Sequence, residues 1–499
     1  MFNPDFSPLN GTIESMWIPQ TRAIPGLALL LLLAAGSPSP ARAQCAGTVS
    51  TPRAAADCAA ASIPQATTAS LDPAHPYTLA ELIDLAEHNN LRTRIVWERA
   101  KQRANQLGIA RSAYYPLLAG IASVAGERII NPFPKPLAPD GFVMVTAAQI
   151  QPELKLQYLL FDGGRDARVD AATQAQLAAG ANFIQANQEV AFRVSSAYYR
   201  LLTAQERLAA AEETLKTART TLDAADARLN NGRGTLPDVL NARSETAQAV
   251  FDRESADGDE QIARVALTES IGAEPSPNIR IDAQKDAPPP QQLALPIDAL
   301  VDRALAARPD LMAVAAEIRA ADDEIRAAKA EYKPRIVTEV SAAQTSLFPS
   351  ASYGELGSAS RPTWTAALLV EWTLFDGGAR RNHVEAAESR RRQAQDEMTE
   401  IHDRATREVW TAWINFRSAL RKNEAALSLL DSASTSYAAS LDAYNAGVRN
   451  LVDVVTAEKQ LAQARLSGVA ARSQLFLEAV DLEFVTGNLL RTLPAATTK

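Results

Sequence analysis

The sequence predicts a mainly helical protein with a small β part, built from two structural repeats. Three observations support this fold class. A period-two apolar pattern runs into Phe-Asp-Gly-Gly twice, a heptad pattern follows each copy, and a Gly-x5-Asp-Val motif closes each heptad run. We therefore expect each repeat to combine two strands with a long antiparallel helical hairpin, so that one chain supplies four strands.

The strand before each Phe-Asp-Gly-Gly has one apolar face. Every second residue is apolar at Leu154, Leu156, Tyr158 and Leu160, and again at Leu368, Val370, Trp372 and Leu374. The two junctions that follow are Phe161, Asp162, Gly163 and Gly164, and Phe375, Asp376, Gly377 and Gly378. Glycine reaches turn conformations that are costly for other residues, so each Asp-Gly-Gly is expected to turn the backbone from strand to helix.

Large residues recur every seven positions after each junction. In the first copy they are Val194, Leu201, Leu208, Leu215, Leu222 and Leu229; in the second they are Phe416, Asn423, Leu430, Tyr437 and Tyr444. Small residues, mostly alanine, occupy the alternate positions of this a/d seam, which lets helix backbones approach closely. The first such helix is expected from Arg165 to about Asn230, which is roughly 100 Å at ~1.5 Å per residue.

A second repeated motif ends each long helix. Residues 231–242 and 446–457 both read Gly-x5-Asp-Val-[Leu/Val]-x-Ala. Gly232 and Gly447 suit the position just after a helix C-cap, and Thr235 suits the N-cap of a returning helix. Each repeat is therefore expected to turn back at this tip into a second long helix.

The remaining elements and boundaries follow from proline stops and composition. Helices are expected at 77–115 and 300–332, each stopped by a proline, with strands at 117–125 and 335–343. The predicted domains are a signal peptide at 1–43, a flexible leader at 44–76, a first repeat at 77–275, a linker at 276–295, a second repeat at 296–490 and a tail at 491–499.

The N-terminus has the features of an export signal. Arg22 precedes an apolar run at 23–35, and Ala41-Arg42-Ala43 would be a cleavage site that leaves Gln44 as the mature start. Met16 is an alternative start residue. The apolar run is too short for a membrane-spanning helix, and no later stretch is apolar enough, so a membrane span of the exported chain would have to consist of strands.

The two cysteines, Cys45 and Cys58, both follow the expected cleavage site. A disulfide between them in an oxidising compartment and lipid attachment at Cys45 are two alternatives. Gln44 argues against the lipid anchor, because that modification requires a small residue directly before the cysteine.

Composition and motifs exclude several function classes. The net charge of −8 argues against a nucleic-acid binder, which would show a basic face. The run Arg390-Arg391-Arg392 lies among Glu and Gln residues and is interpreted as a solvated patch. The four histidines show no metal-ligand spacing, and no nucleotide loop or nucleophile motif is present. We therefore predict that the chain is not an enzyme and uses no cofactor or metal.

Four strands cannot close a barrel by themselves. Open strand edges are not tolerated in lipid, because each unpaired backbone group costs several kcal/mol there. The strands are therefore expected to be completed by further copies of the chain, which predicts an oligomer.

The order of strand pair, Phe-Asp-Gly-Gly, helical hairpin and tip motif, written twice behind a signal peptide, resembles the TolC-like outer membrane efflux protein family over 77–488. The resemblance implies a homotrimer whose strands form one shared twelve-stranded β-barrel in outer-membrane lipid and whose helices form an α-barrel tunnel in the periplasm. It implies the outer-membrane component of a tripartite efflux or type I secretion system. The partners would be a periplasmic adaptor (membrane fusion protein) and an inner-membrane pump of RND, ABC or MFS type. Drugs, metal ions and proteins all remain open as cargo.

The resemblance also implies roles for tip residues. Asp238, Tyr444 and Arg449 match the residues with which such proteins latch the periplasmic mouth, and Asp453 matches a tunnel-facing acid. Three copies of Asp453 would form a negative ring that favours cations. Gly232 and Gly447 match tip glycines near the adaptor contact.

Other interpretations of these residues stay open at this point. Asp238 and Asp453 also suit the first turn of a helix for electrostatic reasons alone, and Tyr444 suits the last seam position. Phe161 and Phe375 suit aromatics at a barrel–tunnel interface. An exported periplasmic coiled-coil scaffold or adaptor without a pore is the alternative function, although an adaptor would carry one helical hairpin and many more strands.

Overall fold

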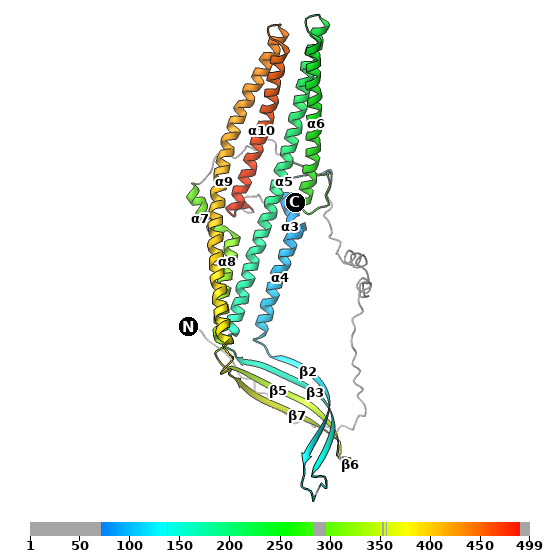
Figure 1. Ribbon diagram of the computed structural model, residues 1–499, viewed down its shortest axis with the longest axis vertical. Coiled ribbons are helices and arrows are strands. Elements are labelled where there is room, and N and C mark those ends of the chain that lie inside the picture. Colours follow the sequence, from blue (N-terminus) through cyan, green and yellow to red (C-terminus); the bar gives the residue numbers. More distant parts are fainter. Residues whose placement is uncertain (1–70, 137, 283–295, 352–353, 356, 490–499) are drawn as a thin grey trace, which may run out of the picture. The chain divides into compact units, whose positions relative to one another are not determined.

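Figure 1 shows the computed structural model, which describes residues 71–136, 138–282, 296–351, 354–355 and 357–489. All of these residues fall within one compact unit. The first repeat holds β1 (Pro76–Tyr77), α3 (Leu79–Asn89), α4 (Leu91–Ser112), β2 (Leu117–Pro132), β3 (Phe142–Phe161), α5 (Arg165–Asn230), α6 (Leu236–Ser270) and β4 (Arg280–Ile281). The second holds α7 (Ile297–Ala307), α8 (Pro309–Ala330), β5 (Arg335–Ala351), β6 (Gly354–Glu355), β7 (Ala359–Glu371), α9 (Ala379–Asn445) and α10 (Leu451–Val485).

The two shorter helices of the prediction are each broken in two. The helix expected over 77–115 is interrupted at Asn90, whose extended backbone (φ −67°, ψ 127°) and side-chain oxygen cap α4. The helix expected over 300–332 is interrupted at Arg308 (φ −68°, ψ 126°), because Pro309 disfavours a helical backbone in the residue before it. The single-helix predictions were wrong, because a cap and a proline outweighed the periodic apolar pattern.

Both breaks contact the long helices, but by different interactions. The Asn90 Nδ2 donates a hydrogen bond of 3.1 Å to the carbonyl of Ser270, the last residue of α6. Arg308 is 8% exposed and pairs with Glu408 of α9 at 2.6 Å. The two repeats therefore use an amide hydrogen bond in one joint and a buried ion pair in the other.

The long strands exceed or fall short of their predicted lengths. β2 and β5 run 16 and 17 residues, beyond the predicted 117–125 and 335–343. β7 ends at Glu371, so Trp372 and Leu374 lie outside the strand that was predicted for them. The reason is the register: Glu371 pairs with Arg335, the first residue of β5, which directly follows Pro334, and the ladder ends there.

One antiparallel sheet joins the two repeats. Its order is β2–β3–β5–β7, with β6 also paired to β5, and the β3–β5 pairing crosses from one repeat to the other. In the described part of the chain, β2 and β7 each pair on one side only. Apolar side chains such as Val124, Trp364 and Leu368 are exposed on this sheet in the single chain.

The long helices pack as α6–α5–α10–α9, with α10 against α5 joining the two hairpins. The predicted seam lies in these contacts and is confirmed. Its buried members include Val194, Leu201, Ala204, Ala218, Ala225, Ala412, Phe416, Ala419, Asn423, Ala426, Ala433, Ser440 and Tyr444. Because alanines such as Ala218 and Ala225 are buried at alternate seam positions, the backbones approach closely there.

Short helices cover the long ones in two separate cores. α3 packs on α5 and α6 around Leu82, Val194 and Leu267, while α7 packs on α9 and α10 around Phe416 and Leu475. β1 and β4 pair in parallel beside the first core. Among the described helices, none is both long and apolar enough to span a membrane.

Several predictions concern residues outside the described part of the chain. These are the signal peptide at 1–43 with both start residues, the leader before residue 71, Cys45 and Cys58, the linker over 283–295 and the tail at 491–499. The domain boundaries as a whole remain predictions.

We expect Leu201→Ala to lower the free energy of unfolding by about 2–5 kcal/mol, because Leu201 is 0% exposed and its loss leaves a cavity. Thermal melting followed by helical circular dichroism measures the change. The control, Leu91→Ala, removes a side chain that is 58% exposed and should change stability by no more than ~0.5 kcal/mol. Equal losses in both variants would contradict the placement of Leu201 in the core.

Candidate gate at the helix tips and junctions

Both tips end their long helix in the same way. Gly232 (φ +68°) and Gly447 (φ +83°) adopt the left-handed conformation that the sequence predicts after the C-cap. The next N–H reaches back to the helix, from Arg233 to the Arg228 carbonyl (2.8 Å) and from Val448 to the Ala443 carbonyl (2.9 Å). These bonds form a Schellman motif, which satisfies helix carbonyls that would otherwise be unpaired.

The returning helices begin with side-chain caps. Thr235 Oγ1 accepts the Asp238 N–H (3.4 Å), and the Asp238 carboxylate accepts the Thr235 N–H (3.2 Å) and hydroxyl (2.7 Å). At the second tip, Asn450 Oδ1 accepts the N–H of Asp453 at 2.9 Å. In this state Asp238 serves as a helix cap, and Asp453 occupies a first helical turn where its charge favours the helix dipole.

The structure brings part of the predicted latch together. Tyr444 is 3% exposed and packs with Val239 and Val454 in the cluster that joins both tips. Its hydroxyl is buried and has no hydrogen-bond partner in the described structure. Burial raises the pKa of Tyr444 and the negative charge of Asp238 raises it further, against the opposing effect of Arg228.

Arg449 contacts neither of the other latch residues within this chain. Its guanidinium donates to the Ser440 hydroxyl at 3.2 Å, and no carboxylate of the described residues lies within ion-pair distance of it. The predicted three-residue latch is therefore only partly assembled in one copy of the chain.

Sequence reasoning missed Arg228, which holds the two tips together. Its guanidinium lies 4.4 Å from the centre of the Tyr444 ring and donates to the Tyr444 carbonyl. Arg228 is in the last turn of α5, where a cation is favoured by the helix dipole. A basic residue in that turn was the available signal, but its partner lies 216 residues away.

Each strand-to-helix junction is organised by its aspartate. Asp162 Oδ1 accepts the Gly164 N–H at 2.8 Å, and Asp376 Oδ1 accepts the Gly378 N–H at 3.0 Å. Arg380 donates to Asp376 through both its backbone (3.1 Å) and its side chain (2.6 Å). These bonds fix the turn from strand to helix and place the carboxylate at the start of a long helix.

The glycines of the two junctions are required for different reasons. Gly377 (φ +67°) and Gly378 (φ +93°) are left-handed, as expected. Gly163 and Gly164 are not; instead, a Cβ would lie 2.7 Å from the Lys333 side chain at Gly163 and 3.3 Å from the Ala327 carbonyl at Gly164. The expected turn is present at both junctions, but at the first one the glycines are required for close packing against Ala327 and Lys333 rather than for a left-handed backbone.

An arginine stacks on a tyrosine beside each junction. Arg165 lies 4.6 Å from the Tyr114 ring centre and Arg380 lies 4.9 Å from that of Tyr332. Phe161 and Phe375 are 43% and 87% exposed in the single chain. The junction is therefore held by polar and cation–π contacts, and the two phenylalanines do not form part of a core within one chain.

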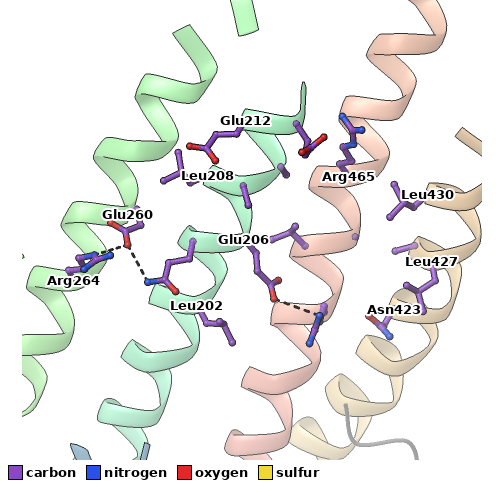
Figure 2. A pocket seen from close by; sticks show the side chains of 18 residues that line it. Leu202, Glu206, Leu208, Glu212, Glu260, Arg264, Asn423, Leu427, Leu430 and Arg465 are labelled. Carbon is purple, nitrogen blue, oxygen red and sulfur yellow. Dashed lines mark hydrogen bonds and ion pairs between the residues drawn. The ribbon is translucent and has the colours of Figure 1, made fainter. Parts of the chain in front are cut away.

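A groove of about 770 Å³ crosses the helix layer on the strand side of the tips. Figure 2 shows its walls, formed by α6, α5, α10 and α9 in that order. Glu260 pairs with Arg264 at 2.6 Å and Glu206 with Arg472 at 3.7 Å, while leucines such as Leu427 line the rest. Among the described residues, no group of three or more His, Cys, Asp or Glu is placed to hold a metal ion.

Two strand pairs, each leading into a long helical hairpin, define a class of proteins built from two such repeats around one shared sheet. The model of the outer membrane efflux protein family matches residues 82–273 and 300–488. The chain therefore belongs to the outer membrane efflux protein family. The predicted function class and outer-membrane localisation are confirmed at that level, and the alternative of a scaffold without a pore is not supported.

Individual relatives cover most of the chain. Protein CyaE of Bordetella pertussis is 27% identical over 425 residues, covering 83% of this chain and 85% of that protein. Outer membrane efflux protein BepC of Brucella suis is 23% identical over 386 residues, covering 77% and 79%. A crystal structure of a membrane protein from Pseudomonas aeruginosa is 26% identical, with a TM-score of 0.70, and covers 85% of this chain and 98% of that one. The family is a transport component rather than a class of enzymes.

We expect Gly378→Ala to lower stability by about 1–2 kcal/mol, because an L-residue pays that amount in the left-handed region. The control, Gly180→Ala, lies inside α5 with no atom within 4 Å of the new Cβ. It should be neutral or stabilising by up to about 1 kcal/mol. Chemical unfolding of the two variants compares them, and equal effects would contradict the left-handed assignment.

We expect Arg228→Ala to raise amide hydrogen exchange over 440–456 about tenfold, since a cation–π contact and a charged hydrogen bond are both lost. Arg228→Lys keeps the charge without the planar stack and should lie between wild type and Ala. Arg243→Ala removes an exposed cation of α6 and should leave exchange unchanged. Unaltered exchange in Arg228→Ala would show that the tips are held by their apolar cluster alone.

Proposed function

We propose that three copies of this chain form a passive conduit that carries substrates across the periplasm and outer membrane. The sheet supports this: in the described residues β2 and β7 each lack a partner on one side, and apolar side chains face outward. Joining such edges between copies would give 3 × 4 = 12 strands in a closed barrel with no open edge in lipid. The long helices would then lie in the periplasm as the tunnel wall.

The observation that carries the proposal is the pair of tips packed on each other at the end of the helical hairpins. Tyr444, Val239 and Leu451 form one buried cluster from both repeats. A conduit whose hairpin tips pack together is closed at that end, and separating the tips would open it. The energy for this must come from a partner, namely a periplasmic adaptor coupled to an inner-membrane pump.

Asp238 is placed to switch between two hydrogen-bonded states. In this structure the Asp238 carboxylate caps α6 by accepting hydrogen bonds from Thr235. The buried Tyr444 hydroxyl has no acceptor among the described residues, and the charge of Asp238 acts on it. Turning the carboxylate from Thr235 to Tyr444 would give up the two hydrogen bonds from Thr235 and form one with the Tyr444 hydroxyl. Arg449, which is exposed, is proposed to reach Asp238 of a neighbouring copy, a contact worth only ~1 kcal/mol at such a site.

Further tip residues are proposed to face the partner and the lumen. Val448 and Val452 are 80% and 62% exposed beside Gly447, which suits an adaptor contact at the tip glycines Gly232 and Gly447. Asp453 is exposed in the first turn of α10, and three copies would ring the opening with negative charge that favours cations.

We expect the double variant Asp238→Ala/Arg449→Ala to conduct more than wild type in planar bilayers, because the latch contacts that hold the tips are removed. The control, Arg253→Ala/Glu254→Ala, removes an exposed ion pair of 2.7 Å from α6 and should keep the small wild-type conductance. Chemical cross-linking of the same preparations should give a trimer. If the proteins are monomeric and do not conduct, the conduit proposal is wrong and the result favours a scaffold without a pore.

A further inference from the structure

One buried acid of the described helical hairpins, Glu458, forms no ion pair. Of the buried charged residues among those described, Glu260, Arg308 and Asp323 each form an ion pair. Glu458 of α10 is 6% exposed and forms none. Burying an unpaired carboxylate is costly, so the neutral acid is favoured in this packing.

The hydrogen bond of Glu458 goes to a hydroxyl on the other repeat. Thr221 of α5 is 1% exposed, and its Oγ1 donates to Glu458 Oε2 at 2.8 Å. The Tyr437 hydroxyl of α9 lies 3.3 Å from the same Oγ1. Thr221, Tyr437 and Glu458, which we call the buried triad, therefore connect three helices and both hairpins.

The hydrogen-bond count of the buried triad depends on the proton of Glu458. Thr221 has one hydroxyl proton, and its Oγ1 also lies 3.3 Å from the Thr217 carbonyl. When Glu458 is ionised, Thr221 must donate to the carboxylate. When Glu458 is neutral, its own O–H can donate to Thr221, which is then free to donate to the Thr217 carbonyl. Protonation of Glu458 thus adds a hydrogen-bond donor to a site where acceptors otherwise outnumber donors.

The buried triad lies directly against the tip cluster. Tyr437 packs on that cluster together with Leu222, the neighbour of Thr221. Separation of the two hairpins at the tips would therefore admit water to Glu458, where its carboxylate is well solvated. Opening and loss of the proton are consequently linked.

The charged groups around Glu458 come from all the packed helices. Glu245 of α6 and Lys459 form an ion pair of 2.8 Å, Arg465 of α10 donates to Thr217 at 3.2 Å, and Tyr437 is the titratable group of α9. Burial raises the pKa of Glu458 and Glu245 raises it further, whereas the Thr221 hydrogen bond, Lys459 and Arg465 lower it; the net shift is upward.

We propose that Glu458 is a proton-sensitive lock between the two hairpins, closed as the neutral acid and loosened as the carboxylate. This rests on the proposed conduit. Since the folded-state pKa is raised above the ordinary 4.5, the stabilisation is complete below that value and is lost as the pH rises through the raised one. The conduit therefore opens more readily as the pH rises across this window.

The test is planar-bilayer conductance of the full-length protein between about pH 4 and about pH 8, a range that spans carboxyl titration. All variants carry Asp453→Asn, which removes the exposed carboxylate in the first turn of α10. The parent should conduct more as the pH rises. Each copy of Glu458 contributes up to tenfold for each unit by which its closed-state pKa exceeds its open-state pKa, and three copies that open together contribute up to the cube of that factor. Glu458→Gln should stay at the low, acid-side conductance throughout.

Two matched variants separate the lock from a general charge effect. Glu424→Gln removes an exposed carboxylate of α9 and should keep the parent profile. Thr221→Val removes the hydrogen bond that favours the carboxylate, so the rise should remain but move to higher pH. The lock proposal is wrong if the conductance of Glu458→Gln rises with pH as it does in the parent. It is also wrong if the conductance of Glu424→Gln no longer changes with pH.

A second readout keeps this test separate from the conduit itself. At a pH above 4.5 the parent should show the infrared carbonyl band of protonated carboxylic acids. The band should be weaker in Glu458→Gln, where Asp481, whose pKa burial raises to about 6, still contributes. If the infrared band is present but no variant conducts, including Asp238→Ala/Arg449→Ala, the conduit proposal is wrong. The lock proposal, which depends on the conduit, is then wrong as well. If the proteins conduct but the band does not differ between parent and Glu458→Gln, only the lock fails.

Discussion

The close approach of four long helices is the constraint on which the rest of this structure depends. Small residues such as Ala218, Ala225 and Ala464 fill the seams, so that backbones rather than bulky side chains set the helix spacing. Packing of this kind gives a thin layer with little core of its own. The larger apolar side chains are accordingly concentrated where α3 and α7 cover the layer and at the tips, which leaves the stretches between to polar contacts.

The two repeats solve the same geometrical problems with different chemistry. The break before each second helix is fixed by Asn90 in one repeat and by Arg308 with Pro309 in the other. The junction glycines serve close packing in the first repeat and a left-handed backbone in the second. Such divergence gives the two hairpins different tolerances to substitution, because each depends on its own local contacts.

Charged side chains hold the tip end of the long helices by weak, reversible contacts. Arg228 stacks on Tyr444, Asp238 shares its carboxylate with a helix cap, and Glu458 is buried against Thr221. None of these is a strong buried ion pair like that of Arg308 near the short helices. In the proposed conduit, contacts of about 1 kcal/mol would let a partner separate the tips more readily than a tightly packed core would.

The sequence by itself determined the features that depend on local periodicity and backbone chemistry: the strand before the first junction, the heptad seam, the extent of α5, the tip glycines and the Thr235 cap. Only the tertiary structure decided what depends on a distant partner. β7 stops at Glu371 because β5 begins opposite it, Arg228 finds a ring 216 residues away, and Glu458 is buried because α5 and α9 cover it. The pattern of apolar residues along the chain shows which face of a helix is apolar, but not which other helix packs against that face.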